Sequence, residues 1–130
     1  MTNMRLEDIK FKAKRLDNGQ WVVGDLLHSY DDGVIIIPIT KVGESKGGAF
    51  SVDPTTICQY TGLKDKDGKE IWEGDILRVS SVRCIVIWRE ELGGFYLSEL
   101  EFSSLGNVPL GEMLSDLKYE RLGSKFDKEA

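Results

Sequence analysis

Short runs of alternating apolar and polar residues recur along this chain, each bounded by Gly, Asn or Asp residues that favour turns. The densest example covers residues 59–79, where two half-apolar runs flank a polar turn at residues 64–69. Gly68 can supply the positive φ that a tight hairpin turn requires. Glu73-Gly74-Asp75 then predicts a second bend before another apolar run. The segment therefore predicts consecutive antiparallel strands.

The N-terminal part of the chain predicts another hairpin. Ile9, Phe11 and Ala13 alternate with three lysines, which is the pattern of a strand with one wet face. Asn18-Gly19 favours a tight turn, and an apolar run follows it. We therefore expect a hairpin over residues 9–27, with the lysines facing solvent.

Residues 34–37, Val-Ile-Ile-Ile, are apolar at every position, which is typical of a central strand covered on both faces. Pro38 should lie near the end of this strand, because proline cannot donate a hydrogen bond to the ladder. The glycine-rich stretch at residues 43–48 is the best candidate for a mobile loop.

Almost no segment offers helix periodicity over three turns. We expect a mainly β fold, a small barrel (SH3-like or related) built from consecutive hairpins, with at most one or two short helical turns. At 130 residues the length fits one domain. We place it at residues 1–123 and predict a charged tail at residues 124–130.

Composition limits the classes of partner. The net charge of −5 disfavours broad binding to nucleic acid, which requires a surplus of Lys and Arg. Cys58 and Cys84 lie in apolar runs and predict reduced, buried thiols. The N-terminus lacks the apolar core of a secretion signal, and no apolar run could span a bilayer. We therefore expect a cytoplasmic protein without membrane contact.

Gly24-Asp25 and Gly74-Asp75 occupy equivalent places in two segments that echo one another at an offset of 50 residues. Two similar hairpin units packed together are one interpretation, and independent recurrence of a common bend is the favoured one. A pair of carboxylates for acid–base chemistry can be imagined if the two bends face each other. The favoured alternative is that each carboxylate accepts backbone N–H bonds at its bend.

Three separated segments resemble the YopX proteins of phages and prophages. Residues 53–79 are similar to the family signature, with Asp-Pro, Gln-Tyr-Thr-Gly-Leu, Asp-x-x-Gly-Lys-x-Ile and Glu-Gly-Asp-Ile. Residues 9–13 and 21–27 are similar to the opening of the family, and residues 119–127 resemble a divergent version of its closing strand. The resemblance implies a mainly β, barrel-containing fold, a mobile-element origin and self-association. It implies no catalytic residues.

Other chemistry finds little support in the sequence. Asp65-Lys66-Asp67-Gly68 resembles the start of a calcium loop, but the twelfth position is Ile76 where that loop needs a glutamate. His28 is the only histidine and cannot form a multi-histidine metal site. We therefore expect no metal site, no cofactor and no enzymatic activity.

Our leading hypothesis is a non-catalytic module that binds an unidentified host or phage protein or assembles with itself. The alternative is a single-stranded nucleic-acid or nucleoprotein binder, in which aromatic rings stack on bases and nearby cations contact phosphates. For either function the candidate contact residues lie in or near the second hairpin. They are Tyr60, Lys64, Lys66, Lys69, Trp72 and Arg78.

Overall fold

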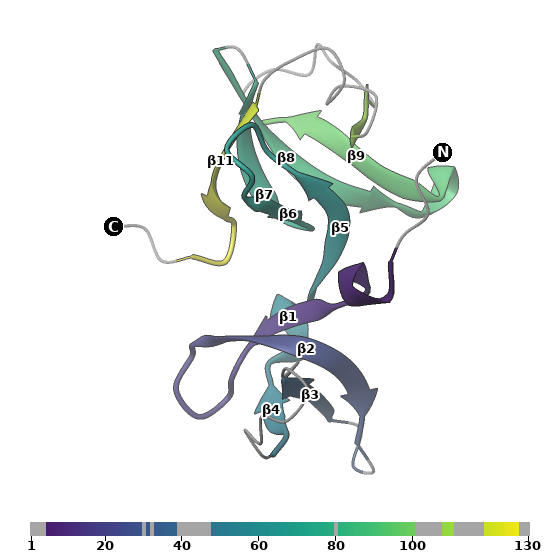
Figure 1. Ribbon diagram of the computed structural model, residues 1–130, viewed down its shortest axis with the longest axis vertical. Coiled ribbons are helices and arrows are strands. Elements are labelled where there is room, and N and C mark those ends of the chain that lie inside the picture. The colour runs from purple at the N-terminus through teal and green to yellow at the C-terminus, as the bar shows by residue number, and fades with distance from the viewer. Residues whose placement is uncertain are drawn as a thin grey trace. The chain divides into compact units, whose positions relative to one another are not determined.

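The computed structural model describes residues 5–29, 31, 33–38, 48–79, 81–100, 108–110 and 119–127. Antiparallel strands dominate them, so the prediction of a mainly β fold is confirmed (Figure 1). The helical elements with described bounds are three single 3-10 turns, where one or two were expected. These are η1 (Leu6–Asp8), η2 (Pro54–Thr56) and η3 (Glu90–Leu92).

The chain forms two compact units, residues 1–60 and residues 61–130. The first unit holds four strands and the beginning of a fifth, paired in the order β4-β3-β2-β1-β5. Its apolar core is built from Ala13, Val34, Ile36 and Val52. The strands are β1 (Phe11–Lys14), β2 (Trp21–His28), β3 (Val34–Pro38), β4 (Phe50–Val52) and β5 (Cys58–Lys64).

The predicted hairpin at residues 9–27 is confirmed. β1 and β2 pair antiparallel with Lys14 opposite Trp21, and Gly19 takes a φ of 71° in the turn between them. The prediction that the lysines of β1 face solvent is only partly correct. Lys12 is buried, and its Nζ lies 4.5 Å from the centre of the Trp21 ring. Its aliphatic stem can pack on apolar surface while the ammonium contacts the ring face.

Gly24 lies inside β2, so the predicted bend at Gly24-Asp25 is wrong. A Cβ at this position would collide with the backbone carbonyl of Ile37 on the neighbouring strand. The glycine therefore permits close approach of two strands, which is its other common use in sheets. Gly74 by contrast lies between two strands with a φ of 84°. The two segments are thus similar in sequence but not in local structure.

β3 lies between β2 and β4, so its prediction as a central strand ending near Pro38 is confirmed. Coverage on both faces is not observed. Val34 and Ile36 face the core, whereas Ile37 on the other face is 39% exposed. Within the described part of the chain, Ile37 therefore leaves the second face of this strand partly exposed.

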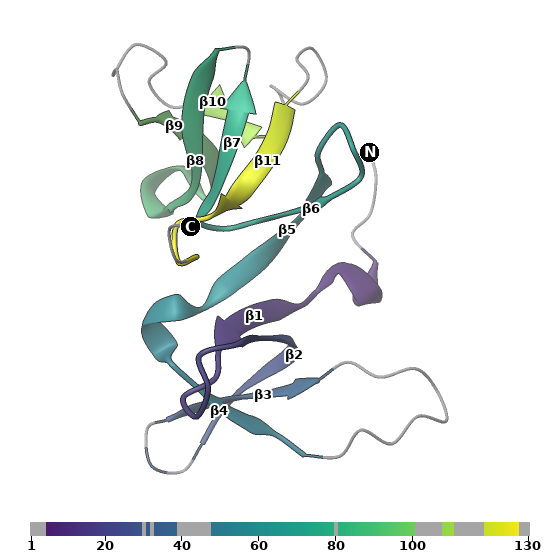
Figure 2. The same cartoon turned by 90° about the vertical axis from the view of Figure 1, so that its left-hand side faces the viewer.

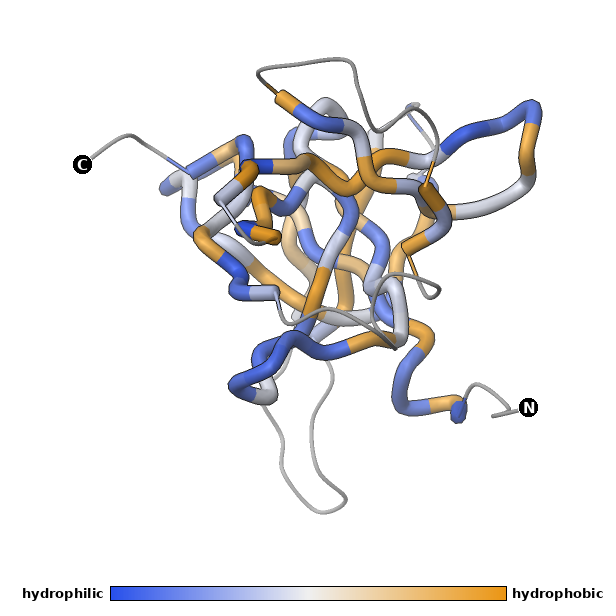
Figure 3. The backbone as a smooth tube through the Cα atoms, turned by 90° about the horizontal axis from the view of Figure 1, so that it is seen from above, coloured by the Kyte–Doolittle hydropathy of each residue, from blue (hydrophilic) through white to orange (hydrophobic). Residues whose placement is uncertain are grey.

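The second unit contains a five-stranded sheet in the order β10-β9-β8-β7-β11 and the hairpin formed by β5 and β6 (Figure 2). Ile71, Leu77, Val86 and Leu97 are fully buried in its core. Hydrophobic and hydrophilic stretches alternate along the chain (Figure 3). The remaining strands are β6 (Glu70–Trp72), β7 (Asp75–Val79), β8 (Val82–Arg89), β9 (Gly94–Glu99), β10 (Val108–Pro109) and β11 (Tyr119–Ser124).

The predicted barrel is wrong, because neither sheet closes among the described residues. In the first unit, β2 and β5 pair with the two edges of β1. β4 therefore contacts only the end of β1, through a single bridge between Arg15 and Val52. In the second unit the outer strands are β10 and β11, and β10 is only two residues long. A barrel requires an uninterrupted ladder around the whole circuit, which these edges do not supply.

Hydrogen bonds hold residues 124–127, the described part of the predicted tail. β11 extends to Ser124, and the Lys125 amide donates to the Gly74 carbonyl at 2.9 Å. Asp127 closes a turn by accepting from the Ser124 amide. The segment predicted to be mobile at residues 43–48 lies outside the described residues except for Gly48. A single domain over residues 1–123 stays a prediction, because two compact units can unfold as one.

Candidate functional site

The turn between β5 and β6 is held from within by Asp65, which is buried. Its Oδ1 accepts backbone hydrogen bonds from Asp67 and Lys69, both at 2.9 Å. The Asp65 amide donates to the Lys69 carbonyl at 2.8 Å, and Gly68 takes a φ of 82°. An aspartate that binds the backbone two and four residues ahead fixes the turn without any metal ion.

Asp65 also joins this turn to the last strand. Its Oδ2 accepts from the Arg121 amide of β11 at 2.8 Å. Burial alone would raise the pKa of this carboxyl, but the hydrogen bonds from the amides of Arg121, Lys69 and Asp67 outweigh it, and the pKa is lowered. The carboxylate is therefore the form that the fold stabilises.

The predicted bend at Glu73-Gly74-Asp75 is confirmed between β6 and β7. Asp75 is fully buried. Its Oδ2 accepts from the Trp72 amide at 2.7 Å, across the bend. For Asp75 the prediction that the carboxylate accepts a backbone N–H bond is therefore confirmed.

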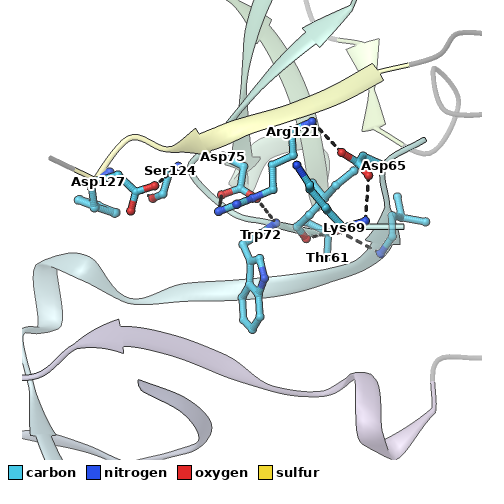
Figure 4. A network of polar contacts seen from close by, with 11 residues as sticks. Thr61, Asp65, Lys69, Trp72, Asp75, Arg121, Ser124 and Asp127 are labelled. Carbon is cyan, nitrogen blue, oxygen red and sulfur yellow. Dashed lines mark hydrogen bonds and ion pairs between the residues drawn. The ribbon is translucent and has the colours of Figure 1, made fainter. Parts of the chain in front are cut away.

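Arg121 completes the network by reaching Asp75 with its guanidinium (Figure 4). Nε lies 2.7 Å from Oδ2 of Asp75, and the Nη2 atom lies 3.2 Å from Oδ1. Burial alone would lower the pKa of Arg121, but the hydrogen bonds to Asp75 and the charges of Asp75, Asp127 and Asp65 raise it. The two-pronged contact is the geometry in which arginine binds carboxylates most strongly.

The network therefore connects the β5–β6 turn, β6, β7 and β11. The connecting groups are the carboxylates of Asp65 and Asp75 and the guanidinium of Arg121. Asp65 and Asp75 belong to the signature segment, and Arg121 belongs to the last strand. Both oxygens of Asp75 are occupied by partners inside the unit. A carboxylate bound in this way stabilises the fold and is not presented to a substrate.

Asp25, the second member of the imagined carboxylate pair, lies exposed within β2. Its position inside a strand contradicts the expectation that it accepts N–H bonds at a bend. Among the described residues, no group of three or more His, Cys, Asp or Glu side chains is placed to hold a metal ion. His28 is exposed at the end of β2.

The six predicted contact residues fall into two groups. Tyr60 and Trp72 are 1% and 5% exposed, so neither ring offers an open face for stacking. The four cationic side chains are exposed, and Arg78 forms an ion pair with Glu120 at 3.4 Å. The lysines are brought together by the Asp65 turn; they are Lys64, Lys66 and Lys69. Whether these residues contact a partner stays a prediction.

Sequence reasoning missed the role of Arg121. A signal was present, since Arg121 is two residues from the aromatic Tyr119 in the segment that resembles a closing strand, and alternate residues of a strand share one face. An arginine on an apolar strand face predicts a buried acidic partner. Which of the aspartates would be the partner depends on strand pairing far apart in the sequence.

The thiols are buried as expected, and neither Cys58 nor Cys84 forms a disulfide in the described part of the chain. Burial, together with the charge of Glu99, raises the pKa of the Cys84 thiol. A buried thiol with a raised pKa is a poor nucleophile.

Comparison with known families agrees with the signature segment. The model of the YopX protein family matches residues 10–114. The chain belongs to the YopX family. The match covers both aspartates of the network but ends before β11, which carries Arg121. No curated protein matches this YopX chain. In the described residues, no helix has the length and hydropathy needed to cross a bilayer.

Proposed function

We propose that this YopX chain is a non-catalytic module of phage or prophage origin that binds a protein partner or assembles with itself in the host cytoplasm. The proposal rests on the structural role of the two buried aspartates in the signature segment. Asp65 and Asp75 are buried and bound to β11 and to their own bends, so the signature maintains a fold. Exposed apolar side chains on strands, such as Leu27 and Ile37, are suited to contacts with another protein.

Site-specific photo-cross-linking in host cells tests this proposal. A photoreactive residue replaces Leu27 in one variant and exposed Lys66 in a second. A third variant carries it at Ala13, which is fully buried in the core and serves as the matched control. We expect a discrete covalent adduct of defined mass at one of the two exposed positions and none at the control. If neither exposed position gives an adduct and the purified chain is monomeric, the proposal is wrong.

A single-stranded nucleic-acid binder is the second candidate, and the exposed lysines of the Asp65 turn support it. The net charge of −5 and the buried rings of Tyr60 and Trp72 weigh against it. Fluorescence anisotropy with mixed-sequence DNA and RNA oligonucleotides at low salt separates the two candidates. Binding that weakens with salt and is lost in a Lys64→Glu/Lys66→Glu/Lys69→Glu variant supports this function. No binding at low salt eliminates it.

A further inference from the structure

The strands β7, β8 and β9 of the second unit place alternate side chains in its core, and the intervening side chains form a second face of the sheet. The core side chains of these strands are Leu77, Val79, Cys84, Val86 and Leu97. On the second face the register places Ile76 opposite Ile85, and Ile87 opposite Tyr96. These four side chains are half-buried, and they form an apolar centre. We call this surface the β7–β9 face.

Arginines border the apolar centre of the β7–β9 face. β8 carries Arg83 near its beginning and Arg89 at its end, on the same side as Ile85 and Ile87 between them. Arg78 of β7 lies opposite Arg83. The positions of β7, β8 and β9 on this side include no Asp or Glu, although the chain has a net charge of −5. The face therefore concentrates positive charge around apolar side chains.

Two of these arginines have only loose ion pairs with their neighbours. Nη1 of Arg78 lies 3.4 Å from Oε1 of Glu120. Nη1 of Arg89 lies 3.9 Å from Oε1 of Glu91. Charge-assisted hydrogen bonds of good geometry are shorter, at about 2.7 to 2.9 Å. The side chains of Arg78 and Arg89 are 56% and 36% exposed, so both guanidinium groups can bind a carboxylate from another molecule.

The geometry of the face limits the conformation of an occupant. Inside a sheet the backbone groups are already paired within the ladder, so the face offers side chains and no backbone hydrogen bonds. An occupant must therefore satisfy its own backbone, as an α-helix does. Arg83 and Arg89 are six residues apart, which is about 20 Å along a strand. A helix of about 13 residues spans that distance.

We propose that the β7–β9 face binds an amphipathic helix of another protein, whose apolar side chains cover Ile85 and Ile87 and whose carboxylates contact Arg83 and Arg89. The proposal rests on the partner-binding form of the proposed function and adds the chemistry of the partner. A helix packed on the apolar face of a sheet is a common way for both elements to bury their apolar sides. Nucleic acid fits this face less well, because isoleucine offers no ring on which bases stack.

Fluorescence anisotropy of labelled synthetic peptides with the full chain tests the proposal. The probe is an amphipathic helix of about 16 residues, with leucines along one side and glutamates at both ends. We expect saturable binding with a Kd below about 100 µM. Two matched peptides carry lysines in place of the glutamates or serines in place of the leucines. Each should bind about tenfold more weakly or worse, because each removes one of the two complementary features.

Variants of the chain locate the binding surface. Arg83→Glu and Arg89→Glu should each weaken binding of the acidic peptide about tenfold or more, because carboxylates would then face carboxylates. Ile87→Ser should have a similar effect through loss of apolar contact. Arg5→Glu makes the same charge change at an exposed arginine of the first unit. This matched control should change the affinity by less than about twofold at physiological salt.

Four results would overturn the proposal, and far-ultraviolet circular dichroism confirms that each variant is folded. The first is no saturation by the acidic peptide up to about 1 mM, or equal affinity for all three peptides. The second is unchanged binding in the variants of the face. The third is displacement of the peptide by mixed-sequence oligonucleotides, which would assign the face to nucleic acid. The fourth is self-association in sedimentation velocity that Ile87→Ser abolishes, which would make a second copy the occupant.

Failure of this proposal is distinguishable from failure of the proposed function. A covalent adduct with a different protein at Leu27 or Lys66 in host cells, together with no peptide binding, would leave the proposed function intact and remove the β7–β9 face as the site.

Discussion

Arg121 and Asp75 form a largely buried ion pair. Asp75 is fully buried and Arg121 has 23% of its side chain exposed. The desolvation cost of such a pair is offset by its mutual attraction and by the additional hydrogen bond from the Trp72 amide. The free energy of unfolding is therefore far more sensitive to loss of one partner than to loss of both.

We predict that Arg121→Met lowers the free energy of unfolding by about 3 kcal/mol or more, because it leaves the Asp75 carboxylate buried without a counter-charge. Urea denaturation followed by tryptophan fluorescence measures the change. The matched control is Arg78→Met, which breaks an exposed pair with Glu120 between the same two strands and should cost about 1 kcal/mol or less. Equal losses in the two variants would contradict a structural role for the buried pair.

Asp65 gives stability a defined pH dependence. Its pKa is lowered in the folded chain relative to about 3.9 in an unfolded one, so its contribution is fully present above that unfolded value. The contribution is lost as pH falls through the folded pKa. We expect Asp65→Asn to cost about 1 to 3 kcal/mol near neutral pH. The difference from the wild type should shrink below about pH 4.

Urea denaturation at a series of pH values tests this, with Asp67→Asn as the control for loss of an exposed charge in the same turn. A difference between the wild type and Asp65→Asn that stays constant down to about pH 2 would show that the ionised carboxylate does not hold the turn.

At the scale of elements, the bend between β6 and β7 depends on one backbone conformation. Gly74 has a φ of 84°, and a Cβ there would touch only the flexible Lys125 side chain at 3.5 Å. The cost of a substitution is therefore conformational. We predict that Gly74→Ala lowers the free energy of unfolding by about 1 to 2 kcal/mol.

Gly94→Ala is its matched control in the same unit. Gly94 lies in β9 without a positive φ, and a Cβ there would be in ordinary contact with the Tyr96 ring at 3.7 Å. That substitution should be neutral or stabilising by about 0.4 to 1 kcal/mol. Equal destabilisation by the two alanines, measured by thermal unfolding, would contradict the conformational explanation.

The elements predictable from sequence are those defined by local chemistry. The turn at Asn18-Gly19 and the bend at Gly74 have their strands on either side as expected. Gly24 was misassigned because a bend and a close approach of two strands select the same residue. Sequence adjacent to Gly24 does not reveal the Ile37 carbonyl that excludes a side chain there. The Arg121 contacts were missed for the same reason, since they join residues 46 and 56 positions apart.

At the scale of the whole molecule, local patterns predict strands but not whether the edges of a sheet pair with one another. The mainly β class follows from alternation and turns, whereas barrel closure depends on which edges meet. Here β1 pairs with β5 along the edge to which β4 would have to pair in order to close a barrel. The division into two units could also not be predicted from the sequence. The boundary falls inside β5, which runs without a break from Cys58 to Lys64 and contributes to both units.

That continuous strand leads to a prediction about cooperativity. Cys58 belongs to the first unit and Cys84 to the second, and both are buried, so alkylation of each thiol reports the opening of its own unit. Because unfolding either unit removes pairing partners from β5, we expect both thiols to become reactive at the same urea concentration. Pulse alkylation with mass spectrometry of the two cysteine peptides measures this. Exposure of Cys58 at a clearly lower concentration than Cys84 would show that the units unfold independently and that residues 1–123 are not one domain.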